Sequence, residues 1–208
     1  MDQTISYYER NAKEFCRTTK DADMSFNRDR FLSLLGQQNL TEDTSKNERS
    51  SIHILDAGCG SGRDAKAFLD AGYRVTAMDA SAQICREAEE LLEQKVFCLR
   101  FEELQFRQEF NGIWACASLL HVPYTEISGV LKLLWMALKE DGVIYASFKY
   151  GDGGRTDNGR TFYNYKEGDL KELMERNRFC IEDLYVTCDV RKDRAEERWV
   201  NVLARKIG

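Results

Sequence analysis

The chain has 208 residues, of which 43% are hydrophobic, and this size most simply fits one domain (1–208) with a full-sized core. Its formal net charge of −5 argues mildly against a broad nucleic-acid footprint, and seven scattered cysteines without a Cys-x-x-Cys pair argue against zinc or a disulfide framework. No secretory signal is visible, and no apolar run approaches the roughly 18 residues that cross a bilayer. We therefore expect a cytoplasmic protein with reduced thiols and no membrane partner.

The N-terminal part, 1–50, predicts two helical pieces between residues 3 and 36, followed by a polar connection. The first piece places one apolar group on a single face and the second supplies another. These groups are Ile5, Tyr8, Ala12 and Phe15, and then Phe26, Phe31, Leu32 and Leu35. Gly36 suits a helix end, and residues 37–51 offer almost nothing to bury, so we expect this connection to be mobile.

The chain is organised around residues 52–64, where an apolar strand leads through three glycines into a helix. Glycines at 58, 60 and 62 permit positive φ angles and remove the Cβ atoms that would keep a ligand from the backbone. A second strand, 73–79, ends in Asp79 about 20 residues after the first glycine. An acid at that distance is placed to accept hydrogen bonds from both hydroxyls of a ribose.

The glycine spacing separates the possible nucleotide ligands. Dinucleotide enzymes use Gly-x-Gly-x-x-Gly, whereas this chain has Gly-x-Gly-x-Gly led by Asp56, with no phosphate-binding lysine after it. Residues 55–64 closely resemble the first motif of the class I S-adenosylmethionine-dependent methyltransferases, and Asp79 matches the ribose-binding acid of that family. The alternative is a glycine-rich turn that only connects a strand to a helix, but it leaves Asp79 unexplained.

The rest of the chain alternates helices and strands. We expect a helix at 64–71 that Gly72 closes, and further helices at 125–139 and 169–177. Another helix should begin after Ser81, which can cap it, and its buried stripe would consist of Ile84, Ala88, Leu91 and Leu92. We expect further strands at 96–99, 111–116, 143–148, 179–187 and 198–204. This order predicts an α/β fold with a doubly wound, mostly parallel sheet and a C-terminal antiparallel hairpin. The resemblance implies a Rossmann-like sheet of seven strands and an N-terminal helical lid, with Tyr8 at the lid tyrosine. Ordinary core packing is the alternative for Tyr8.

The resemblance also implies which residues hold S-adenosylmethionine. Backbone atoms of Gly58, Cys59 and Gly60 would face the methionine part, Arg63 its carboxylate, and Ala80 the adenine. A similar Gly-x-Gly-Arg arrangement occurs in tellurite-resistance methyltransferases, although Arg63 is equally consistent with a surface position.

The sequence departs from the family after the third strand. Arg100 replaces the expected aspartate, so Phe101 with Glu102 or Glu103 becomes the candidate for adenine recognition; alternatively, these are solvated charges on a turn.

Residues 116–122 resemble the next family motif, which passes close to the transferring methyl, so Cys116 and His121 become candidates. The titration range of histidine suits His121 as a catalytic general base. A structural histidine in an apolar run is the alternative, and His53, inside the first strand, is expected to be structural.

Residues 148–162 form a predicted glycine-rich loop beside the expected acceptor pocket. We take Lys149, Tyr150, Arg155 and Arg160 as candidate substrate contacts, and the two arginines favour an anionic acceptor. The alternative is a flexible surface loop.

These patterns predict an enzyme that transfers a methyl group from S-adenosylmethionine to a small-molecule acceptor by in-line displacement, without a metal. Two alternatives stay open: a methyltransferase acting on tRNA or protein, and a non-catalytic adenosylmethionine-binding protein. The acceptor and the oligomeric state are not encoded in a readable pattern.

Overall fold

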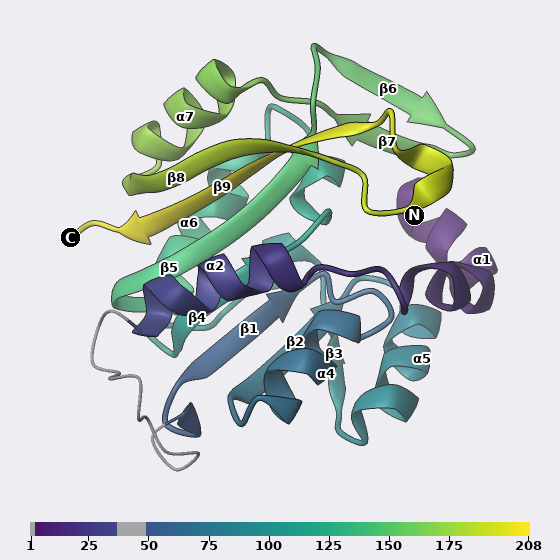
Figure 1. Ribbon diagram of the computed structural model, residues 1–208, viewed down its shortest axis with the longest axis horizontal. Coiled ribbons are helices and arrows are strands. Elements are labelled where there is room, and N and C mark those ends of the chain that lie inside the picture. The colour runs from purple at the N-terminus through teal and green to yellow at the C-terminus, as the bar shows by residue number, and fades with distance from the viewer. Residues whose placement is uncertain (1–2, 37–48) are drawn as a thin grey trace.

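The computed structural model describes residues 3–36 and 49–208 (Figure 1). Residues 37–48 make up most of the predicted polar connection, and they lie outside the described residues. All seven cysteines are free thiols. Among the described helices, none combines the length and the apolar character that a bilayer crossing requires.

One seven-stranded sheet in the order β3-β2-β1-β4-β5-β9-β8 forms the centre of the molecule. Its first five strands pair in parallel, and β9 pairs antiparallel with both β5 and β8. The strands are β1 His53–Ala57, β2 Arg74–Asp79, β3 Val96–Cys98, β4 Phe110–Ala115, β5 Leu138–Lys149, β8 Phe179–Cys188 and β9 Arg198–Lys206. The predicted fold class is confirmed, and the strand order reverses between β1 and β4, the usual place for a ligand site in such sheets.

Helices cover both faces of this sheet. In Figure 1, α2 lies in front of the sheet and α6 behind it. The two faces bury separate clusters, one containing Phe31, Phe68 and Trp114, the other containing Leu131 and Met174. The helices are α1 Gln3–Thr19, α2 Ser25–Gly36, α4 Arg63–Asp70, α5 Ala82–Leu92, α6 Ile127–Ala137 and α7 Glu167–Arg176, with short 3₁₀ turns η1 Phe101–Glu103, η2 Leu119–His121 and η3 Lys192–Arg194.

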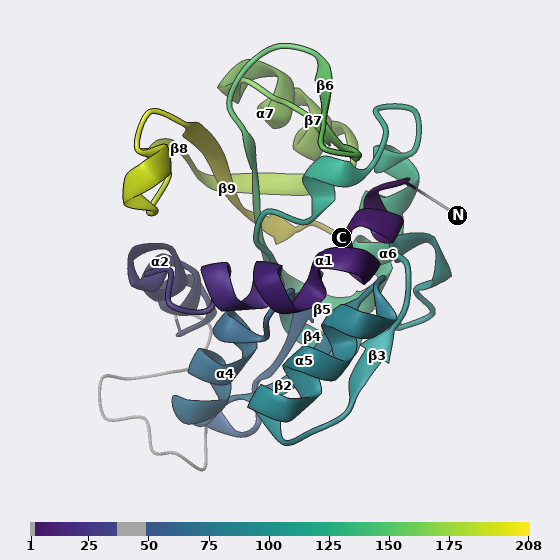
Figure 2. The same cartoon turned by 90° about the vertical axis from the view of Figure 1, so that its right-hand side faces the viewer.

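The N-terminal helix α1 lies across the end of the sheet instead of on a face. Figure 2 shows it passing between two further strands above, β6 (Gly154–Asp157) and β7 (Arg160–Tyr163), and helices α4 and α5 below. Phe15 of α1 would contact a Cβ atom at Gly60 at 3.3 Å, so the helix rests on the glycine turn. The predicted N-terminal helices thus exist, and α1 has the position of a cover.

Two residues predicted to be buried are not. Phe26 is 57% exposed, because it lies about 140° around α2 from Phe31, outside the buried face of Asn27, Phe31 and Leu35. Leu91 is 38% exposed, because the buried stripe of α5 is centred on Cys85 and Ala88 instead. Each of the two predicted apolar sets therefore contains one residue that the structure leaves exposed.

The predicted helix 125–139 ends early, at Ala137, and β5 begins immediately at Leu138. Asp141, expected to end the helix, instead takes a positive φ of 60° inside the strand, where the register between β4 and β5 shifts. The expected turn is therefore a bulge in a longer strand.

The predicted loop 148–162 contains a hairpin, β6 Gly154–Asp157 paired with β7 Arg160–Tyr163. Asn158 and Gly159 form its two-residue turn with positive φ angles of 50° and 81°. An Asn-Gly pair is the strongest sequence signal for such a turn, so the prediction of a loop without secondary structure is wrong for these residues.

Candidate functional site

A cavity of about 790 Å³ lies at the carboxyl ends of the parallel strands, beneath α1. Every residue predicted to bind the cofactor contributes to its lining. These residues are Tyr8, Asp56, Gly58, Cys59, Gly60, Arg63, Asp79, Ala80, Phe101, Glu102 and Cys116. The structure therefore brings together side chains and backbone from four strand ends and from the N-terminal helix.

The glycine turn has a geometry that other residues would not adopt. The backbone N–H groups of Gly58 and Cys59 both donate to the carbonyl of Met78 at 2.9 Å, which fixes the turn against β2. A Cβ atom at Gly58 would lie 2.4 Å from the Cβ of Ser118, and Gly58 has a φ of 83°. Close packing and backbone conformation both require glycine here, and the turn presents bare backbone to the cavity.

Asp79 connects this turn to the next helix. Its carboxylate accepts hydrogen bonds from the backbone N–H of Gly60 at 3.2 Å and of Ser81 at 3.0 Å. Burial raises the pKa of Asp79 to about 6, because removal from water disfavours the charged form more than these two donors stabilise it. The cavity thus contains a carboxylate with spare acceptor capacity.

Asp56 lies beneath the turn and caps the next helix. Its Oδ2 accepts from the backbone N–H of Ala65 at 3.1 Å, at the start of α4. Burial and the nearby Asp64 raise the pKa of Asp56 well above its usual range. Asp56 therefore supports the turn from below while it also lines the cavity.

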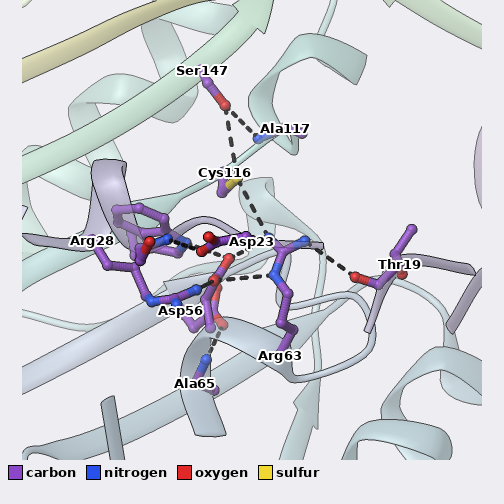
Figure 3. A network of polar contacts seen from close by, with 12 residues as sticks. Thr19, Asp23, Arg28, Asp56, Arg63, Ala65, Cys116, Ala117 and Ser147 are labelled. Atoms are coloured by element: carbon purple, nitrogen blue, oxygen red, sulfur yellow. Dashed lines mark hydrogen bonds and ion pairs between the residues drawn. The ribbon is translucent and has the colours of Figure 1, made fainter. Parts of the chain in front are cut away.

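Arg63 belongs to a buried network, so the surface alternative is wrong for this residue (Figure 3). Its guanidinium bonds the carboxylate of Asp64 at 3.1 and 2.5 Å, and Arg28 approaches the same carboxylate from the other side at 2.6 Å. Burial would raise the pKa of Asp64, but the two arginines hold it below its usual value. Two cations share the Asp64 carboxylate, and Asp23, whose pKa is lowered first by hydrogen bonds from Ser25, also lies close enough for both arginines to lower it further.

The turn after β3 distinguishes the two candidate acids. Glu103 accepts a hydrogen bond from the backbone N–H of Arg100 at 2.8 Å, so it caps its own turn. Glu102 lines the cavity, 3.6 Å from the Arg100 guanidinium. Phe101 lies close to Gly58, 3.7 Å from the position of a Cβ there. Phe101 and Glu102 therefore remain as the pair facing the cavity.

His121 connects α1 to β7. Its Nε2 lies 3.0 Å from the Tyr8 hydroxyl, and its Nδ1 lies 2.6 Å from the carbonyl oxygen of Thr161. A carbonyl only accepts, so Nδ1 carries a proton, and in the neutral ring Nε2 accepts from Tyr8. The backbone N–H of Thr161 donates in turn to the hydroxyl of Thr4 at 3.1 Å. We call Thr4, Tyr8, His121 and Thr161 the α1 latch.

The four predicted substrate contacts divide into two pairs. Lys149 and Arg160 line the cavity, whereas Tyr150 and Arg155 do not. Tyr150 follows Lys149 in an extended segment and so points to the other side, where the Arg198 guanidinium lies 4.3 Å from its ring centre. Arg155 lies on the outer hairpin strand β6 and is exposed.

The structure adds cavity residues that the sequence did not suggest. The turn between β8 and β9 contributes Asp189, Arg191 and Arg194, and Trp199 follows at the start of β9. This turn is recognisable in the sequence as a charged segment, but nothing in the sequence shows that it folds over Lys149. Within the described residues, no group of three possible metal ligands comes together.

Comparisons with known proteins give a consistent result. Residues 54–142 match a family model described as a methyltransferase domain. A malonyl-[acyl-carrier protein] O-methyltransferase from Acetivibrio thermocellus is 29% identical over 101 residues, a match covering 46% of this chain. The matched region is 35% of that relative, so the likeness spans about a third of its length.

Solved structures resemble the whole chain. The 1,6-didemethyltoxoflavin-N1-methyltransferase of Burkholderia thailandensis, bound to 1,6-didemethyltoxoflavin and S-adenosylhomocysteine, has a TM-score of 0.76 and 22% identity, covering 99% of this chain and 88% of that chain. The magnesium protoporphyrin IX methyltransferase of Synechocystis PCC 6803, with bound S-adenosylhomocysteine, has a TM-score of 0.66 and 18% identity, covering 97% of each chain. At these identities, the likeness shows a shared fold.

Proposed function

Because the chain contains a class I S-adenosylmethionine-dependent methyltransferase domain, we propose that it transfers a methyl group from S-adenosylmethionine to a small-molecule acceptor. The observation that carries this proposal is the glycine turn with Asp79 beside it in one cavity. A Cβ at Gly58 would collide with Ser118, so packing requires glycine there, and the backbone of this turn lines the cavity.

The lining fits the parts of this cofactor. Asp79 would accept from the ribose hydroxyls, Phe101 and Glu102 with Ala80 would hold the adenine, and Arg63 would pair with the methionine carboxylate. When bound, the cofactor supplies an activated methyl group on a sulfonium. The chain then has to align the acceptor atom and exclude water, and alignment alone can contribute about 7–11 kcal/mol.

We assign His121 a positioning role within the α1 latch. Both of its ring nitrogens are engaged by the protein, through Thr161 and Tyr8, so neither faces the acceptor as a base. A base role would require the Tyr8 hydroxyl to leave Nε2. The latch instead holds α1 over the cavity and keeps water from the reacting atoms.

A small molecule is the acceptor that suits this enclosure. The cavity is bounded by α1, by β7 and by the turn between β8 and β9, and Lys149 and Arg160 reach into it. The two solved relatives named above also carry small-molecule substrates in their names.

Calorimetry of the full chain with S-adenosylmethionine, S-adenosylhomocysteine and NAD tests the cofactor assignment. We expect the first two to bind and NAD not to bind; equal or tighter binding of NAD would refute the assignment. Transfer of tritium from methyl-labelled S-adenosylmethionine to the low-molecular-weight fraction of a cell extract tests the reaction. Label in protein or RNA, with none in that fraction, would favour a macromolecular acceptor.

A further inference from the structure

A second group of cations lies at the end of the cavity away from the glycine turn. Lys149 comes from the end of β5, and Arg191 and Arg194 come from the turn between β8 and β9. All three line the same cavity, although more than forty positions separate the lysine from the arginines. This cluster, which we call the distal cluster, has no role in the cofactor contacts proposed above.

Lys149 is buried with its ammonium between two aromatic rings. Its Nζ lies 5.0 Å from the ring centre of Trp199 and 5.5 Å from that of Phe162, and it pairs with Glu197. Burial, together with repulsion from Arg155, Arg194 and Arg191, lowers the pKa of Lys149 to about 8. The ammonium is therefore held where additional negative charge would be favourable.

The two arginines are anchored differently. Arg191 binds the carboxylate of Asp189 at 2.9 and 2.7 Å, and the indole N–H of Trp199 donates to the same carboxylate at 3.1 Å. Arg194 lies 3.8 Å from Glu197, and its side chain is 39% exposed. Arg191 is thus fixed in place, while Arg194 retains donors for a ligand.

The charges of the distal cluster do not balance. Lys149, Arg191 and Arg194 face the carboxylates of Asp189 and Glu197. Arg160 adds a fourth cation to the lining and lies 3.9 Å from Asp157, whose side chain is 52% exposed, so positive charge is in excess. Asp193 lies 4.0 Å from Arg194, but its side chain is 79% exposed, so water screens its charge. The distal end of the cavity is therefore net positive.

We propose that the methyl acceptor is a small molecule carrying one carboxylate, which binds at Lys149, Arg191 and Arg194. This inference rests on the proposed function and specifies its substrate class. The excess positive charge favours an anion, and the carboxylates of Asp189 and Glu197 at the same cluster favour one negative charge on the ligand over the two of a phosphate. The aromatic rings of Trp199 and Phe162 lie beside Lys149 in the cavity lining, so the body of the acceptor contacts an apolar surface.

The test compares three probes that share a fluorophenyl ring and differ in their head group; the benzoate and the benzamide also have nearly the same shape. Fluorine-19 NMR line broadening of 4-fluorobenzoate, 4-fluorobenzamide and 4-fluorophenyl phosphate is measured with the full chain, saturated with S-adenosylhomocysteine. We expect the benzoate to bind about tenfold more tightly than the amide, because only the carboxylate makes charge-assisted hydrogen bonds. Lys149→Met and Arg194→Gln should each remove most of this preference.

Arg176→Gln is the matched control, since Arg176 also pairs with an acid but lies exposed on α7. It should keep the full preference. Arg194→Gln lies on a partly exposed turn, so it remains informative if Lys149→Met fails to fold. Equal binding of benzoate and amide, tighter binding of the phosphate, or an unchanged preference in both variants would overturn the inference. Calorimetry on the same samples separates the failures: loss of S-adenosylhomocysteine binding by the unmodified chain would refute the proposed function itself.

Discussion

The two ends of the cavity are built in different ways. At the glycine turn, the contacts come from backbone groups and from neighbouring strands, with Gly58, Gly60 and Asp79 all within one strand-helix-strand unit. At the distal end, side chains from β5, β7 and the β8–β9 turn meet, and β9 pairs with a strand fifty residues earlier in the chain. The first end depends on backbone geometry and tolerates little change, while the second depends on charge and can be altered one side chain at a time.

The largest effect should follow from Gly58→Ala. The new Cβ would lie 2.4 Å from Ser118 in a left-handed backbone conformation, so we expect unfolding free energy to fall by about 2–4 kcal/mol. Binding of S-adenosylhomocysteine should fall by about 100-fold or more as the turn moves. Urea denaturation and calorimetry measure the two effects.

Gly129→Ala is its control, because nothing lies within 4 Å of a Cβ at this position in α6. Stability there should rise by about 0.5–1 kcal/mol, the ordinary helix preference of alanine over glycine. Equal losses in both variants would mean that the turn has no special geometry.

Asp79→Asn should separate binding from stability. We expect affinity for S-adenosylhomocysteine to fall about 100-fold, because hydrogen bonds to a charged acceptor are lost. The unliganded protein should become more stable by about 1 kcal/mol at pH 7.5, since the buried carboxylate destabilises the fold above its pKa of about 6. This gain in stability is smaller than the free energy that corresponds to the full pKa shift, because asparagine accepts weaker hydrogen bonds from the backbone N–H groups of Gly60 and Ser81.

The direction in which stability changes with pH follows from the raised pKa of Asp79. Between pH 4 and 6 the folded protein binds more protons than the unfolded chain, so the contribution of Asp79 to stability is lost as pH rises through 6. The stability gain of Asp79→Asn should therefore shrink toward pH 4. Undiminished affinity, or a variant less stable than the parent at pH 7.5, would contradict this account.

Affinity for S-adenosylhomocysteine should depend on pH through the same carboxylate. Above pH 7 it should be constant, and below pH 6 it should fall about tenfold per pH unit, because protonation of Asp79 must be reversed on binding. Asp79→Asn should show a flat profile in calorimetry between pH 5 and 8. A slope that survives this substitution would assign the titration to another group, with Asp56 the next to examine.

The smallest effect concerns the α1 latch. Tyr8→Phe keeps the ring and removes the hydroxyl that contacts His121, so dissociation of S-adenosylhomocysteine should accelerate about fivefold. Tyr7→Phe removes a neighbouring hydroxyl outside the latch and should leave the rate unchanged. Stopped-flow measurement of the dissociation rate checks both variants. Equal acceleration in the two would show that the α1 latch does not retain the ligand.

The same contrast explains what could be read from the sequence. The strand, turn, helix and acid from Asp56 to Asp79 were predicted because each depends on its immediate neighbours. The surroundings of Arg63 were not, because Arg28 arrives from α2 across the connection 37–48 and its position depends on tertiary packing. The distal cluster was missed for the same reason: Arg191 and Arg194 are ordinary turn residues until the chain folds them over Lys149. The β6–β7 hairpin differs, since Asn158-Gly159 gave a local signal that was not used.

The position of α1 has a consequence for turnover. Helix α1 contacts the glycine turn through Phe15. The backbone carbonyl of Thr19 accepts a hydrogen bond from Arg63, and the hydroxyl of Thr4 accepts one from the backbone of β7. Entry and departure at both ends of the cavity therefore depend on the same rigid segment. We therefore expect release from the two ends of the cavity to be coupled, because displacement of this one helix opens both.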